Sequence, residues 1–138
     1  MLNPQTRLSL GIVLAFASNL LAQEIVHTKD SLATVKENVA AKKAVLVDVR
    51  EIDEWEAGHL TGALHLAMSD LADDAKLKQM TKKLDKGKIV YTYCKSGGRS
   101  AIAGGWLKKQ GFDVRPLKAG FKELDEQGFG VSVELKRK

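Results

Sequence analysis

The sequence predicts an α/β domain with a small parallel sheet and helices on both of its faces. Two largely apolar runs, residues 44–49 and 88–94, suit strands that are covered on both faces. Segments with helical spacing of apolar residues separate the strand candidates, as in chains that build a parallel sheet. Ligands of such sheets bind where the strands end, and Cys94, the single cysteine, ends the second run.

The first 22 residues have the layout of a secretory signal peptide. Arg7 precedes an apolar run over residues 8–17, and small residues follow. This run is shorter than the about 20 apolar residues that a membrane-spanning helix needs. We expect cleavage after Ala22, or else after Ala17, and export without stable membrane association, to the periplasm if the protein is bacterial. An uncleaved N-terminal anchor and a buried first helix are the alternatives.

The elements of the domain begin with a helix within residues 28–43. Apolar residues recur there at helical spacing, and Asp30 or Thr28 is the expected N-cap. The strand over residues 44–49 follows, and the next segment, EIDEWEA, predicts a short helix that ends at Gly58.

The middle of the chain continues the alternation. A turn at residues 61–62 leads into a short strand, and residues 69–84 show leucine and methionine at helix-like intervals. The strand over residues 88–94 is followed by a predicted helix over residues 99–110, which Gly111 closes.

The last elements are a third strand candidate over residues 112–117 and a glycine turn with a short helix over residues 118–129. We place one domain over residues 30–130 and a short basic tail over residues 131–138. The formal net charge of the 138 residues is +5, and lysines are scattered among acids. A nucleic-acid binder usually concentrates its basic residues on one stripe, so we expect no nucleic-acid partner. The sequence does not indicate whether the protein is a monomer or an oligomer.

The loop after Cys94 has the composition of an anion-binding site. Gly97 and Gly98 can adopt backbone angles that other residues avoid, so that successive N–H groups point into one concavity. The following helix adds unpaired N–H groups at its N-terminus, and Lys95 and Arg99 add positive charge. Such surroundings lower the pKa of a thiol from about 8.5 to about 3.5–7.5. The loop therefore predicts a nucleophilic cysteine that forms a covalent intermediate.

An inert, buried cysteine before a glycine turn is the alternative interpretation of Cys94. A metal site is not supported, because the chain has no second cysteine and its three histidines lie far from Cys94 in sequence.

Residues outside the loop are expected to support it. Asp48 and Arg50 follow the first strand and should lie at the same sheet edge. Asp48 is a candidate acceptor for N–H groups or hydroxyls of the loop, whereas Arg50 either pairs with Glu54 or attracts anionic substrates. For Glu54 an ordinary ion pair is the favoured role. His59 is expected to be structural, with a hydrogen bond near the turn at residues 61–62.

Three loop residues complete the expected site. Lys95 and Ser96 should face the mouth of the pocket and influence which donor binds. Ser100 should donate a hydrogen bond to the Cys94 sulfur. The predicted substrate-binding residues are Lys95, Ser96, Gly97, Gly98, Arg99 and Ser100.

The loop over residues 94–100, CKSGGRS, resembles the active-site loop of rhodanese-type sulfurtransferases. Residues 47–66 are similar to the upstream signature of that family, which has Asp-x-Arg after a strand, then a Glu, then Gly-His-x-x-Gly-Ala. Residues 118–128 resemble its closing segment, although many members have a tryptophan where this chain has Leu124. The order and spacing of these segments fit over residues 30–130.

The resemblance implies the rhodanese-like fold and the transfer of a sulfane sulfur. Cys94 would attack a small anionic donor such as thiosulfate and become a persulfide. An acceptor would then remove the outer sulfur. This acceptor is cyanide or a cellular thiol, and a protein thiol is one such thiol. The resemblance implies neither a metal nor an organic cofactor.

Two other functions remain open. The first is a sulfur-carrier or protein-interaction module with little turnover, although inactive relatives typically lack the cysteine. The second is a phosphatase-like hydrolase. Four residues separate Cys94 from Arg99, whereas related phosphatases place one residue more there, and the shorter loop suits a persulfide better than a phosphate.

Overall fold

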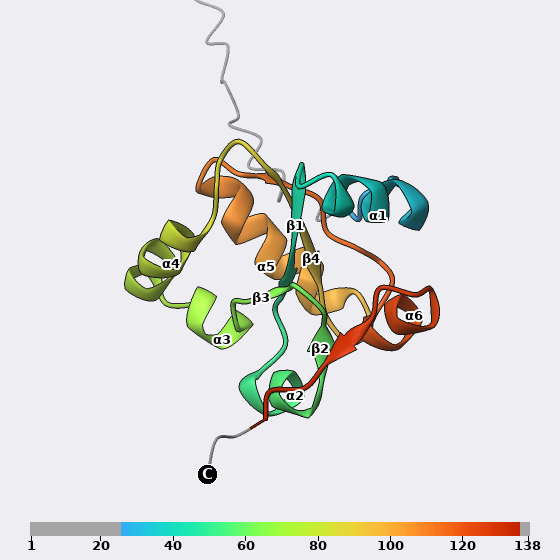
Figure 1. Ribbon diagram of the computed structural model, residues 1–138. Helices are drawn as coiled ribbons and strands as arrows, with labels where there is room; N and C mark the ends of the chain where they lie inside the picture. The colour runs from blue at the N-terminus through green and yellow to red at the C-terminus, as the bar shows by residue number, and fades with distance from the viewer. Residues whose placement is uncertain (1–25, 136–138) are drawn as a thin grey trace, which may run out of the picture.

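The computed structural model describes residues 26–135 (Figure 1). The predicted signal peptide lies outside the described residues. Within residues 26–135, no helix is both long enough and apolar enough to cross a membrane.

A parallel sheet of four strands forms the centre of the domain, in the order β3-β1-β4-β5. The two central strands, β1 (Ala44–Asp48) and β4 (Ile89–Tyr93), pair along their whole length. The edge strands β3 (Leu64–His65) and β5 (Asp113–Val114) are much shorter. The predicted parallel α/β arrangement is therefore confirmed.

Helices cover both faces of the sheet (Figure 1). Those of the described chain are α1 (Leu32–Ala40), α2 (Ile52–Ala57), α3 (Met68–Leu71), α4 (Asp74–Met80), α5 (Gly98–Lys109) and α6 (Phe121–Glu126), with a 3-10 turn at Thr81–Lys83.

Residues of β4 alternate between two apolar clusters, as the two-residue period of a strand requires. Val90, with Cys94 just beyond the strand, belongs to the cluster that contains side chains of α3, α4 and α5. Tyr91 and Tyr93 belong to the cluster that contains side chains of α1 and α6. Cys94 thus leaves the sheet on the face that α5 covers.

The N-cap of α1 is Ser31 rather than Asp30 or Thr28. The Ser31 hydroxyl accepts a hydrogen bond from the N–H of Thr34 at 3.1 Å. Asp30 instead accepts a hydrogen bond from the hydroxyl of Tyr91 at 2.7 Å. The prediction was wrong because a tertiary contact, which the local sequence does not reveal, engages the Asp30 carboxylate.

Two other segments are more interrupted than their patterns predict. Residues 69–84 contain α4, a 3-10 turn and most of α3, because Asp73 caps a new helix by accepting from the N–H of Lys76 at 2.9 Å. The strand candidate over residues 112–117 shortens to β5, since Pro116 has no N–H to donate to a ladder.

The predicted basic tail over residues 131–138 begins with a short strand. Val131–Ser132 form β6, which pairs antiparallel with β2 (His59–Leu60). Gly128 and Gly130, with φ of 83° and 78°, turn the chain back toward β2. The C-terminal segment is thus attached to the domain beside α2.

Candidate active site

Cys94 lies between the end of β4 and the start of α5, and it is 1% exposed. Gly97 precedes α5 with a left-handed φ of 92°, whereas Gly98 is already the first residue of the helix. A Cβ atom on Gly97 would lie 2.7 Å from the carbonyl oxygen of Lys118. Only one of the two glycines therefore supplies the unusual backbone angle, and it also permits a close approach of the closing segment.

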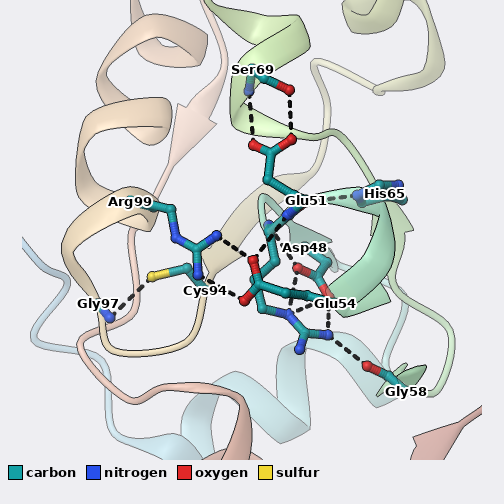
Figure 2. A network of polar contacts seen from close by, with 10 residues as sticks. Asp48, Glu51, Glu54, Gly58, His65, Ser69, Cys94, Gly97 and Arg99 are labelled. Carbon is teal, nitrogen blue, oxygen red and sulfur yellow. Dashed lines mark hydrogen bonds and ion pairs between the residues drawn. The ribbon is translucent and has the colours of Figure 1, made fainter. Parts of the chain in front are cut away.

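Backbone N–H groups act on the Cys94 sulfur, and Figure 2 draws the one from Gly97. The N–H of Gly97 donates to Sγ at 3.1 Å. Burial raises the pKa of Cys94, but the N–H groups of Ser100, Ser96 and Gly97, together with the Ser100 hydroxyl, outweigh it and lower the pKa below its ordinary value. The geometry thus supports the anion-stabilising loop that the glycines predict.

Ser100 also fixes the shape of the loop. Its buried hydroxyl lies 2.9 Å from the carbonyl oxygen of Gly97 and 3.0 Å from that of Leu117. One side chain therefore contacts both the Cys94 loop and the segment that closes over it.

Arg99 pairs with Glu54 of α2, which brings α2 to the rim of the site (Figure 2). Nη1 and Nη2 donate to the two carboxylate oxygens at 2.5 and 2.9 Å. These bonds are the main reason why the pKa of Glu54 falls from 4.5 to about 2. The expected ion pair of Glu54 exists, but its partner is Arg99 and not Arg50.

Arg50 and Asp48 form a separate buried pair. Arg50 donates to the Asp48 carboxylate from Nε at 3.0 and 3.1 Å and from Nη2 at 2.7 Å. Its Nη2 also donates to the carbonyl of Gly58, and its guanidinium lies 4.1 Å from the ring centroid of Phe121. The prediction that Asp48 accepts bonds from the Cys94 loop was wrong, because Arg50 occupies its oxygens.

A hollow of about 500 Å³ opens beside this pair. Lys95 and Ser96 are both exposed and line it, as predicted for residues at the mouth of a pocket. Residues of α2 and α6 complete the lining, among them Glu54, Ala57, Phe121 and Lys122.

The closing segment packs directly on the Cys94 loop. The N–H of Phe121 donates to the carbonyl of Cys94 at 2.8 Å. Gly120, the residue before α6, lies so close that a Cβ atom there would be 1.8 Å from the carbonyl oxygen of Lys95. The resemblance of residues 118–128 to a closing segment therefore corresponds to a real contact.

Two histidines confirm or extend the sequence analysis. His59 is buried, stacks on Trp55 with ring centroids 3.4 Å apart, and has Nδ1 3.0 Å from the Trp55 carbonyl oxygen, which confirms its structural role. His27 was missed: its Nε2 lies 2.7 Å from the carbonyl oxygen of Gly97, 70 positions away. No local pattern signals a contact over that separation.

Comparisons with known proteins agree with this geometry. The rhodanese-like domain family matches residues 31–127. The uncharacterized protein YqhL of Bacillus subtilis is 35% identical over 113 residues, which cover 81% of this chain and 82% of YqhL. Thiosulfate sulfurtransferase GlpE of Coxiella burnetii is 39% identical over 87 residues, 62% of this chain and 76% of GlpE. Among solved structures, a rhodanese-related protein from Thermoplasma volcanium superposes with a TM-score of 0.61 at 27% identity. The match covers 75% of this chain and 95% of that protein's chain.

Proposed function

This chain belongs to the rhodanese-like domain family, and from that premise we propose that it is a sulfurtransferase. It takes a sulfane sulfur from thiosulfate or a similar small anionic donor and passes it to a thiophilic acceptor through a persulfide on Cys94. The observation that carries the proposal is the convergence of backbone N–H groups on a buried sulfur, which lowers the pKa of Cys94. The similarity to a thiosulfate sulfurtransferase supports it.

The loading step needs a thiolate and no proton transfer. The Cys94 thiolate attacks the outer sulfur of thiosulfate, the sulfur–sulfur bond of the donor breaks, and sulfite leaves with the bonding electron pair. The negative charge of the thiolate then resides on the outer sulfur of the persulfide. In the second step cyanide or a thiolate attacks that outer sulfur, and the Cys94 thiolate leaves.

The loop contributes to both steps by stabilising an anion on sulfur. Fixed dipoles in a water-poor site stabilise charge without reorganising during the reaction. Lys95 at the mouth adds positive charge where an anionic donor would enter, whereas Glu54 offsets the charge of Arg99 at the rim. The phosphatase alternative is less favoured, because four residues separate Cys94 from Arg99, one fewer than in related phosphatases.

The burial of Cys94 favours a second candidate function, a sulfur carrier with little turnover. A cysteine that is 1% exposed is shielded from small acceptors unless they enter the mouth of the pocket. A persulfide that forms readily but reacts slowly with cyanide and quickly with a protein thiol would identify the carrier.

Intact-mass measurement after exposure to thiosulfate tests the proposal. The protein should gain the mass of one sulfur atom, and Cys94→Ser, which exchanges one atom, should gain none and form no thiocyanate from cyanide. The alkylation rate of Cys94 plotted against pH should show an inflection below about 8.5, which is the pKa of an unperturbed thiol. Sulfur transfer by Cys94→Ser, or an unperturbed inflection, would end the proposal.

We also propose that the domain acts after export, which the leader-like pattern of residues 1–22 supports. N-terminal sequencing of the protein made in its native host should begin at Gln23. A mature protein that retains Arg7 would contradict cleavage.

A further inference from the structure

The segment before α1 reaches the Cys94 loop through His27. The ring of His27 is half-buried, and its Nε2 lies 2.7 Å from the carbonyl oxygen of Gly97. Since a carbonyl oxygen can only accept, Nε2 carries the proton of this bond. The neighbouring N–H of Thr28 donates to the carbonyl of Pro116 at 2.7 Å. Two bonds from consecutive residues therefore hold this segment against the loop and the chain that follows β5.

The contact acts on the residue whose N–H binds the sulfur. Gly97 donates its N–H to Cys94 Sγ. Its carbonyl accepts hydrogen bonds from Nε2 of His27 and from the hydroxyl of Ser100. The peptide that joins Gly97 to Gly98 is planar and trans, so its C=O and N–H point in opposite directions. Anchoring the carbonyl therefore fixes the N–H of Gly98 on the side away from His27.

Glycine makes this anchor necessary. Gly97 has a φ of 92°, and a glycine has alternative backbone angles that no side chain restricts. Without an anchor on its carbonyl, the peptide after Gly97 can rotate. Its rotation shifts the start of α5, from which the N–H and the hydroxyl of Ser100 act on the sulfur. Ser100 provides one anchor from within α5, and His27 provides a second from a different part of the fold.

We infer that His27 is a positioning residue of the sulfur-binding loop, which holds the loop amides in the orientation that stabilises an anion on Cys94. Its importance for turnover rests on the proposed function. Its effect on the thiol does not, because alkylation of Cys94 reports the anion directly.

Three variants of the full chain test the inference. His27→Phe keeps a ring and removes the donor, whereas His27→Gln retains an N–H donor on a side chain of similar reach. His65→Phe is the matched control, because His65 Nε2 lies 2.8 Å from the carbonyl oxygen of Arg50 and makes the same kind of bond away from the sulfur. The measurement is the rate of Cys94 alkylation by iodoacetamide as a function of pH, with the urea midpoint of each variant.

The expected result is selective. Loss of one hydrogen bond to the loop should raise the inflection of His27→Phe by about 0.4–1 pH unit, which means about 2.5–10-fold less thiolate at a pH below the inflection. His27→Gln should recover at least half of the shift. His65→Phe should leave the inflection at its wild-type position, even if it lowers the urea midpoint as much as His27→Phe does.

Failure of the inference differs from failure of the proposed function. A low inflection in the wild type that His27→Phe does not move, or moves no more than His65→Phe, overturns the role of His27 alone. A shift that appears as expected in a protein that accepts sulfur from no donor upholds the role of His27 and overturns the proposed function.

Discussion

Replacing Gly120 with alanine should separate the closing segment from the Cys94 loop. A Cβ atom at this position would lie 1.8 Å from the Lys95 carbonyl oxygen, 2.6 Å from its carbonyl carbon and 3.1 Å from the Ser96 nitrogen. The backbone angles of Gly120, with φ of −88° and ψ of 175°, suit alanine. The obstacle is therefore contact with main-chain atoms, which cannot rotate away as a flexible side chain can.

The size of the effect follows from these distances. Ordinary contact begins at 3.4 Å, so the two backbones must move apart by about 1.6 Å. The bond from the N–H of Phe121 to the carbonyl of Cys94, now 2.8 Å, cannot survive that movement. One lost hydrogen bond costs about 1 kcal/mol, and overpacking adds about 1–3 kcal/mol. The sum of about 2–4 kcal/mol corresponds to a melting temperature lower by about 8–16 °C.

Thermal unfolding followed by circular dichroism checks this prediction. Gly105→Ala is the matched control, because Gly105 lies within α5 and a Cβ there meets nothing within 4 Å. Alanine is better than glycine in a helix by about 1 kcal/mol, so the same substitution should raise the melting temperature there. An unchanged melting temperature for Gly120→Ala, or equal destabilisation by both variants, would refute the reasoning.

Two further predictions concern the ion pairs beside the loop. The pKa of Glu54 falls from 4.5 to about 2 in the folded protein. Its contribution to the free energy of unfolding is therefore present above pH 4.5 and is lost as the pH falls through 2. Glu54→Gln should therefore lower the free energy of unfolding at pH 7 by about 1 kcal/mol, because both partners are partly exposed. It should also flatten the decline of the urea midpoint between pH 4.5 and 2. A decline as steep as that of the wild type would contradict this prediction. Arg50→Ala should lower the free energy of unfolding by about 3–5 kcal/mol, because it leaves the buried Asp48 carboxylate without its partner. Urea denaturation measures the loss. Lys122→Ala, which removes one partner of the exposed pair with Glu126, is the control and should have no effect. A similar urea midpoint for both variants would argue against the pairing of Arg50 with Asp48.

The sequence predicted those parts of the fold that carry a pattern over several residues. The central strands β1 and β4 lie within the predicted runs because each strand is covered on both faces and must be apolar along its length. The two-residue strands β5 and β6 have no period to detect. Their positions depend on Pro116 and on the turn at residues 128–130, which act only once the neighbouring elements are in place.

The candidate site divides in the same way. The Cys94 loop is local, so its glycines and its helix start could be identified from spacing. The choice of partner for Glu54 depends on how α2 lies against α5, which no spacing encodes. The Asp48–Arg50 pair could have been found, because residues two apart at the end of a strand point to the same side of a sheet.

The pairing of both arginines also shows where stabilisation of the sulfur originates. Arg50 is matched by Asp48 and Arg99 by Glu54, so each guanidinium has a carboxylate beside it and the net charge that the arginines contribute near Cys94 is small. The N–H groups of Ser96, Gly97 and Ser100 have no such compensation, because their partner is the sulfur itself. A buried thiolate next to these groups therefore depends chiefly on backbone orientation. Orientation in turn depends on contacts made by the carbonyl groups of the loop, with His27 on Gly97 and Phe121 on Cys94. Substitutions that disturb those contacts should alter the reactivity of the thiol more than substitutions that remove a charge at the mouth.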